Sequence, residues 1–185
     1  MINAKNVYLR PMELTDVKIK VKWANDEQVR KTLGFSDYPV SELATEAWLR
    51  KSAGNPSRKD FIICLKENDE RIGFCGIKNI DLVNLKAESY LAIGEVSHWG
   101  KGYGLETKQA LLEYSFDHLN LNKVYSLHRE DSKAMIKINL KLGAQQEGKL
   151  REEMRYNGVM TDMVLISVLK ADFRKLINPN TTVHP

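Results

Sequence analysis

The stretch Trp99-Gly100-Lys101-Gly102-Tyr103-Gly104 lies between an apolar run, Tyr90 to Ile93, and an amphipathic helix pattern, Leu105 to Leu119. Glycines let the backbone approach a ligand without a Cβ in the way, and the first amide N–H groups of a helix have no acceptor within it. The helix dipole and the Lys101 ammonium both favour an anion at this end of the helix. The stretch therefore predicts a pyrophosphate-binding turn.

Two common nucleotide-binding loops do not fit this pattern. A Walker loop requires Gly-Lys followed by Ser or Thr, whereas Lys101 is followed by Gly102. A dinucleotide fingerprint requires two residues between its second and third glycines, whereas only Tyr103 separates Gly102 from Gly104. The predicted anion is therefore not expected to belong to a nucleotide of either class.

The turn resembles the acetyl-CoA pyrophosphate loop of the GNAT superfamily of N-acetyltransferases: Gln or Arg, two residues, Gly, one residue, Gly or Ala. Trp99 takes the first place. The longer string from Ile93 to Gly104 is similar to the bacterial branch with ribosomal-protein alanine, polyamine and amino-sugar nucleotide acetyltransferases, where Trp is common there. The resemblance implies acetyl-CoA as cofactor and a pyrophosphate site formed by Trp99, Gly100, Lys101, Gly102, Tyr103 and Gly104.

Length and composition indicate an ordinary globular protein. The 185 residues favour one domain, with 43% hydrophobic and 28% charged residues. Residues Met1 to Arg10 do not have the pattern of a signal peptide, and no apolar run reaches the length of a membrane helix, so we expect a cytoplasmic protein without a membrane partner. Cys64 and Cys75 are expected to be buried free thiols.

The net charge of +4 is spread along the chain, with 28 Lys and Arg against 24 Asp and Glu. It suits a polyanionic cofactor, but no basic stripe with interleaved aromatics predicts a nucleic-acid partner. The four histidines do not have the spacing of a metal site. Ser97 is followed by His-Trp-Gly, which gives no support to a hydrolase of the Gly-x-Ser-x-Gly type.

Hydrophobic periodicity and turn signals predict strands alternating with helices. The expected strands are Val7–Pro11, Phe61–Leu65, Arg71–Ile80, Ala87–Ile93, Lys123–Leu127, Glu147–Tyr156 and Met160–Leu169. The expected helices are Val17–Ala24, Val29–Leu33, Glu42–Lys51, Leu105–Leu119 and a last one from Ser132 to Leu142. In the helix after the glycine turn, Leu112 and Phe116 are expected to face the sheet and Lys108 the solvent.

This element order is that of the GNAT fold. The resemblance implies a mixed α/β fold, a mostly antiparallel central sheet splayed between its fourth and fifth strands, with helices on its flanks. Residues 1–175 would form one domain and residues 176–185 a flexible tail, with fraying expected from Lys170. Leu91, Ala92 and Ile93 map onto the splayed strand that lies along the pantetheine arm of the cofactor.

Acetyl transfer from a thioester to an amine needs a neutral amine, electrophilic help at the carbonyl and a proton for the thiolate. Glu88, in the Ala-Glu pair that opens the splayed strand, is the candidate base. The competing interpretation makes Glu88 a surface carboxylate at a sheet edge, with Asp81 and Glu95 as the alternative bases.

The family's usual acid is a tyrosine on the next helix, and aligning Lys141-Leu142-Gly143 with the family pattern places Asn139 there. Asn139 can hydrogen-bond the sulfur but has no proton to give at neutral pH. The alignment also places Ser132 in the cofactor site, where the family often has Asn. Water, Tyr125 or Tyr156 could replace the acid, or catalysis is poor.

The acceptor end of the cleft is expected between the two early helices and the last hairpin. The candidates are Trp23, Asn25, Tyr38 and Trp48 from the front and Tyr156 from the back. The front lobe resembles that of amino-sugar nucleotide acetyltransferases, which favours a small amine, and ribosomal-protein alanine or polyamine acetylation is the alternative. A CoA-binding sensor without turnover is a second alternative, suggested by Asn139. The family also implies a possible homodimer or larger homo-oligomer.

Overall fold

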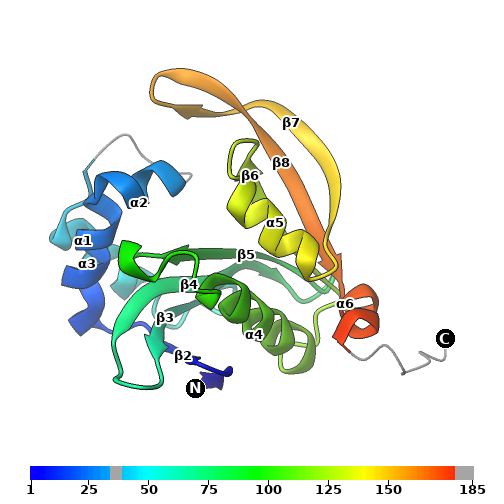
Figure 1. Cartoon of the computed structure of the whole chain (residues 1–185), viewed down its shortest axis with the longest axis horizontal. Helices are drawn as coiled ribbons and strands as arrows, with labels where there is room; N and C mark the ends of the chain where they lie inside the picture. Colours follow the sequence, from blue (N-terminus) through cyan, green and yellow to red (C-terminus); the bar gives the residue numbers. More distant parts are fainter. Residues whose placement is uncertain (34–38, 178–185) are drawn as a thin grey trace.

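The computed structural model describes residues 1–33 and 39–177. Within them a single sheet has the strand order β1-β2-β3-β4-β5-β6-β8-β7, in which only the β5–β6 pair is parallel (Figure 1). Its strands are β1 (Ile2–Asn3), β2 (Val7–Pro11), β3 (Lys59–Leu65), β4 (Arg71–Asp81), β5 (Lys86–Ile93), β6 (Lys123–Arg129), β7 (Gln145–Tyr156) and β8 (Val159–Leu169).

Helices cover both faces of the sheet (Figure 1). The helices are α1 (Val17–Asn25), α2 (Glu27–Thr32), α3 (Glu42–Ser52), α4 (Tyr103–Asp117), α5 (Lys133–Lys141) and α6 (Lys170–Ile177). The first three pack on one face around Trp23, Val29 and Leu49, whereas α4 packs on the other through Leu112 and Phe116. No helix of the two described ranges is long and apolar enough to cross a membrane.

Alternation along the strands explains why there are two cores. In β3, Ile62 and Cys64 face the first three helices, and Ile63 and Leu65 face α4. Both faces of such a strand are buried, which produces the continuous apolar run seen in the sequence. Cys64 and Cys75 are buried free thiols, as predicted.

The predicted mixed α/β architecture is confirmed, but β1, α6 and the short 3₁₀ helices Leu14–Asp16 and Val96–His98 were not predicted. β1 is only two residues long, below what periodicity can detect. The region from Lys170, expected to fray, forms α6 because Phe173 is fully buried and packs 5.5 Å from the Phe116 ring. Ile177 packs against the same core, and the helix is clearly amphipathic, so the pattern was present in the sequence and was overlooked. The expected tail from residue 176 overlaps the end of α6, and residues 178–185 lie outside the described residues.

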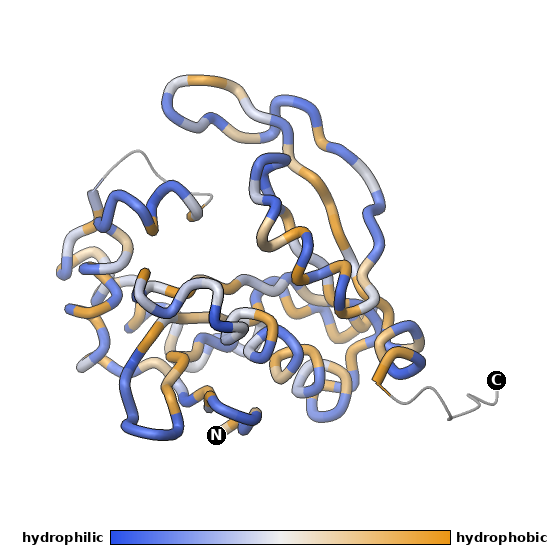
Figure 2. The backbone as a smooth tube through the Cα atoms, viewed as in Figure 1, coloured by the Kyte–Doolittle hydropathy of each residue, from blue (hydrophilic) through white to orange (hydrophobic). Residues whose placement is uncertain are grey.

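The outer hairpin of β7 and β8 extends beyond the rest of the sheet (Figure 1). Asn157 and Gly158 form its turn with φ of 49° and 79°, the left-handed pair that an Asn-Gly turn favours. β7 is hydrophilic along most of its length (Figure 2), and most of its residues are exposed. Charged side chains on an edge strand oppose unwanted strand pairing.

Candidate active site

The glycine turn is built as its sequence requires. Gly100 and Gly102 have φ of 75° and 90°, a left-handed conformation that strains other residues, and Gly102 is the N-cap of α4. A Cβ added to either glycine would have no atom within 4 Å, so this side of the turn is open. The helix begins at Tyr103, two residues before the predicted start. The turn thus presents bare backbone at a helix N-terminus.

The amide groups of this turn are available to a ligand. Across the described ranges, the N–H groups of residues 100–105 donate no hydrogen bond, and the first to do so is that of Glu106, 3.1 Å from the Gly102 oxygen. The Lys101 side chain is exposed beside them. Free amides, the positive end of the α4 dipole and one ammonium fit a pyrophosphate group.

The parallel pair β5–β6 separates partway along its length. Pairing ends at Glu88 and Tyr125, although β5 continues to Ile93 and β6 to Arg129. The Ser89 hydroxyl donates to the Tyr125 oxygen at 3.2 Å where the strands part. We call this point the fork. The predicted splay is therefore present, and it leaves the β6-facing edge of residues 89–93 without a strand partner.

The three β5 residues predicted to line the cofactor differ in what they offer. Ala92 is buried and pairs with Phe74 of β4, whereas Leu91 and Ile93 lie about 3.9 Å from the Cβ position of Gly104. The Trp99 indole Nε1 donates to the Ile93 oxygen at 2.9 Å. The Ile93 oxygen thus already has a partner, and Trp99 connects the end of β5 to the turn.

Glu88 lies at the fork on the face covered by α1 and α3. Its Oε1 pairs with the Lys78 ammonium at 3.0 Å, and its Oε2 accepts from Asn79 Nδ2 at 3.0 Å. The side chain is 13% exposed, so Glu88 is not a solvated carboxylate at a sheet edge. Tyr125 lies opposite it in the register. Burial and the Glu88 carboxylate raise the pKa of Tyr125, which keeps its hydroxyl protonated.

The two alternative bases have structural partners. Asp81 accepts hydrogen bonds from the Val83 and Asn84 amides and so closes an exposed turn. Glu95 accepts from Trp23 Nε1 at 2.7 Å and from Lys22 Nζ at 2.8 Å, and the Lys22 ammonium lowers its pKa. Neither carboxylate lies at the fork.

Asn139 lies on the opposite face of the sheet, in a small buried polar cluster. Its Nδ2 donates to the Met135 oxygen at 2.8 Å and lies 3.1 Å from His128 Nε2. The Ser126 hydroxyl lies 2.9 Å from the same histidine nitrogen. Burial, and secondarily the charge of Lys108, lower the pKa of His128 to about 4, so the ring is neutral at neutral pH. Ser132, at the N-cap of α5, makes no side-chain capping bond.

Lys108 contradicts the expectation of a solvent-facing side chain. It is 3% exposed, and its ammonium donates to the Ser89 hydroxyl at 2.5 Å, at the fork. Helical spacing places residue 108 on the same face as Leu111 and Leu112, which overrides the preference of lysine for water. Burial lowers its pKa from the ordinary 10.5 to about 8.

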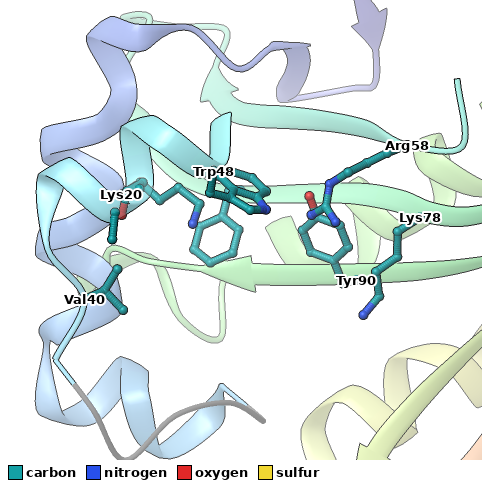
Figure 3. A pocket seen from close by; sticks show the side chains of 9 residues that line it. Lys20, Val40, Trp48, Arg58, Lys78 and Tyr90 are labelled. Atoms are coloured by element: carbon teal, nitrogen blue, oxygen red, sulfur yellow. The ribbon is translucent and has the colours of Figure 1, made fainter. Parts of the chain in front are cut away.

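A pocket of about 330 Å³ opens beside Glu88, between α1, α3 and the sheet (Figure 3). Its walls combine aromatic rings with cationic side chains. The lining residues are Lys20, Val40, Ala44, Thr45, Trp48, Arg58, Phe74, Lys78 and Tyr90. We call it the front pocket. Glu88 adjoins it, since its partner Lys78 lines the wall and Tyr90 is its next neighbour on the same face of β5.

Two of the predicted acceptor residues have other roles. Trp23 is 1% exposed, stacks 6.3 Å from Phe74 and donates to Glu95, so it belongs to the core and not to a binding surface. Asn25 holds the backbone of Val40 through two bonds of 2.8 Å. It therefore shapes the wall of the front pocket indirectly.

The other predicted acceptor residues are divided between two places. Trp48 lines the front pocket, whereas Tyr38 lies outside the described residues. Tyr156 stacks on the Arg129 guanidinium, 3.7 Å from its ring centroid, and Arg129 also donates to the Lys31 oxygen at 2.8 Å. Tyr156 thus takes part in a contact between the outer hairpin, β6 and the end of α2.

Sequence analysis missed the cations of the front pocket. Lys20 lies in α1, Arg58 directly precedes β3, and Lys78 lies in β4. Only the fold brings these three segments together. One sequence signal for Lys20 existed, because it precedes the buried Trp23 and Ala24 by three and four residues. Lysines at 18, 20 and 22 obscured it, since they resemble a uniformly solvated face.

Comparison with known proteins assigns this geometry to a family. A family model for the acetyltransferase (GNAT) domain matches residues 6–145. The chain belongs to the GNAT family. It is an N-acetyltransferase, and acetyl-CoA is the cofactor that this family uses. The open glycine turn and the splayed β5 edge fit such a cofactor.

Individual relatives span nearly the whole GNAT chain. The uncharacterized N-acetyltransferase p20 of Bacillus licheniformis is 32% identical, covering 89% of this chain and 93% of its own. The spermidine N(1)-acetyltransferase of Escherichia coli K12 is 24% identical, covering 94% and 91%. A crystal structure of Vibrio cholerae spermidine N-acetyltransferase in complex with CoA and spermine superposes with a TM-score of 0.84 at 23% identity, covering 91% and 98%.

Proposed function

We propose that this enzyme transfers the acetyl group of acetyl-CoA to a primary amine by direct attack within a ternary complex, with an amino-sugar nucleotide or another small amine as acceptor. The observation that carries the proposal is the position of Glu88. It lies where β5 and β6 part and also adjoins the front pocket. A base at this junction can reach an amine held in the pocket and directed at the fork.

The residues that would hold the cofactor are those of the turn and the splayed strand. The free amides of residues 100–105 and Lys101 would bind the pyrophosphate, and Leu91, Ala92 and Ile93 would line the pantetheine arm, with Ser132 at its other side. Acetyl-CoA supplies a thioester as the acetyl donor. A carboxylate of Glu88 then accepts the proton that the attacking amine loses.

Tyr125 lies opposite Glu88 in the register at the fork, and its hydroxyl can donate a hydrogen bond to the departing sulfur. Its hydroxyl remains protonated because its pKa is raised. Asn139 has its own amide hydrogen bond to Met135 on the opposite face, and Tyr156 stacks on Arg129. We therefore assign to Tyr125 the role that the sequence placed at Asn139.

A direct assay tests the proposed reaction. Protein and acetyl-CoA are mixed in turn with amino-sugar nucleotides, aminoglycosides, polyamines and N-terminal peptides of ribosomal proteins, and free thiol is followed. We expect release above background with a small amine. Release only with ribosomal peptides or polyamines would support those alternatives, and tight CoA binding without any release would support a sensor.

Substituting the turn is expected to weaken cofactor binding. Gly102→Val places a β-branched residue at a φ of 90°, which costs roughly 1–2 kcal/mol in the left-handed region. We expect calorimetry to give about a tenfold weaker Kd for CoA. Gly54→Val is the matched control, since Gly54 also has positive φ and open space but follows α3. An unchanged Kd for Gly102→Val would contradict the assigned site.

Removing the Tyr125 hydroxyl tests the assigned proton donor. Tyr125→Phe should lower kcat and leave the KM for the amine unchanged, because the lost hydrogen bond forms only as the thiolate departs. Tyr156→Phe is the matched control and should keep wild-type kcat. A larger fall for Tyr156→Phe than for Tyr125→Phe would reverse the assignment.

A further inference from the structure

The front pocket carries positive charge on its walls, and none of the described residues that line it is a carboxylate. Lys20, Arg58 and Lys78 each contribute a cation to the lining. Figure 3 shows the Lys20 and Lys78 chains entering from opposite ends, with Trp48 and the Arg58 guanidinium between them. Such a lining attracts an anion and opposes a cation.

Lys20 is the cation without a polar partner. Its ammonium lies 4.6 Å from the centroid of the Trp48 ring and 5.0 Å from that of Phe74. Over residues 1–33 and 39–177 it makes no hydrogen bond and no ion pair. An ammonium has three N–H donors, and contacts with ring faces leave these donors free to bind a ligand. Burial lowers the pKa of Lys20, because the charged ammonium loses hydration in this position.

The other two cations are each paired on the side toward the sheet. Arg58 Nε lies 2.7 Å from Asp60, which also accepts from the Tyr90 hydroxyl. Lys78 is paired with Glu88. The Arg58 guanidinium lies over the Trp48 ring, 4.8 Å from its centroid. Neither acid lines the pocket, and neither lies within ion-pair distance of Lys20.

We propose that the front pocket binds an anionic group, phosphate or carboxylate, carried by the amine that is acetylated, with Lys20 and Arg58 as its main partners. This inference rests on the proposed function and specifies its acceptor. The anion occupies the Lys20 end, and the amine extends along Trp48 and Tyr90 toward Glu88. A polyamine, such as the spermine in complex with the Vibrio cholerae enzyme, would instead place a positive charge against Lys20, whose ammonium has no carboxylate partner among the described residues.

Matched pairs of acceptors test the sign of the charge. Glucosamine is compared with glucosamine 6-phosphate, and putrescine with 4-aminobutyrate, which keeps a chain of four carbons and has a carboxylate in place of one aminomethyl group. We expect kcat/KM for acetyl transfer to be at least about tenfold higher for the anionic member. A preference in the first pair alone indicates phosphate, and in the second alone carboxylate. Equal rates, or faster transfer to the cationic members, would overturn the proposal.

Charge reversal at one position gives the residue-level test. Lys20→Glu should lower kcat/KM for the preferred anionic amine at least about tenfold and reduce or invert the preference within its pair. Lys18→Glu makes the same change on the same helix at an exposed position outside the pocket, and should behave as wild type. Equal effects of the two substitutions on kcat/KM would show that the net charge of the protein, and not Lys20 itself, sets the preference, and would overturn the proposed site.

A binding measurement separates this inference from the proposed reaction. With the glycine turn saturated by CoA, we expect glucosamine 6-phosphate or 4-aminobutyrate to raise the melting temperature of the wild type but not of Lys20→Glu, and spermidine to raise neither. Anion binding without acetyl transfer to any amine would refute the reaction and leave the anion site standing. Acetyl transfer without such anion binding would refute the site alone.

Discussion

Glu88→Gln lowers kcat about a hundredfold to ten-thousandfold, because the attacking amine loses its proton acceptor. Glutamine has nearly the same shape, and its amide oxygen can still accept from the Lys78 ammonium, while a flipped Asn79 amide can accept from the glutamine NH2 group, so the fork should stay intact. Steady-state kinetics, with melting temperature as a check on folding, measures the effect.

The alternative bases provide the controls for this prediction. Asp81→Asn and Glu95→Gln make the same chemical change in a turn and beside Trp23. Both should keep kcat within a few-fold of wild type. If Asp81→Asn or Glu95→Gln loses activity while Glu88→Gln keeps it, the role assigned to Glu88 is wrong, and the base is the residue whose substitution lowers kcat.

Lys108→Met should stabilise the protein by about 3 kcal/mol at pH 7. Burial lowers the pKa of Lys108 from 10.5 to about 8, and each unit corresponds to about 1.4 kcal/mol. Methionine fills a similar volume without a charge, and Ser89 keeps its bond to the Tyr125 oxygen. Urea denaturation of both proteins at several pH values measures the difference. Lys137→Met, at an exposed position, should change stability by less than about 0.5 kcal/mol.

The gain should depend on pH in a defined direction. Below about pH 8, lysine is protonated in both folded and unfolded wild type, so the cost of the buried charge is present in full. Between about 8 and 10.5 the unfolded chain binds more protons, and wild-type stability therefore rises with pH. The advantage of Lys108→Met should shrink across this window. A constant difference, or none at pH 7, would show that the ammonium is not buried at a cost.

The sequence was most informative where local rules and fold agree. The glycine turn, the strand before it and the helix after it were predicted because positive φ and a free helix N-terminus leave a direct mark on residue choice. The splay followed from the family resemblance, and the register now places its start at Glu88 and Tyr125. Glu88 was identified as a candidate base, but its ion pair with Lys78 depends on the register of β4 and β5 and could not be predicted from the sequence.

Sequence reasoning failed where tertiary packing overrides the usual preference of a residue. Lys108 was expected to face the solvent because it is a lysine, although it lies on the same face of the helix as the buried Leu111 and Leu112. Trp23 was assigned to a ligand by its aromatic ring, although it fills the core. The front pocket could not be read from the chain because its cations are far apart in sequence.

The three tryptophans occupy three different environments. Trp23 is sealed in the core, Trp48 is a wall of the front pocket, and Trp99 is 38% exposed next to the glycine turn. Each indole therefore senses a separate event by its intrinsic fluorescence. A variant without Trp99 reports acceptor binding through the fluorescence of Trp48, and a variant without Trp48 reports cofactor binding through that of Trp99. Stopped-flow mixing of each variant can then determine which of the two ligands binds first.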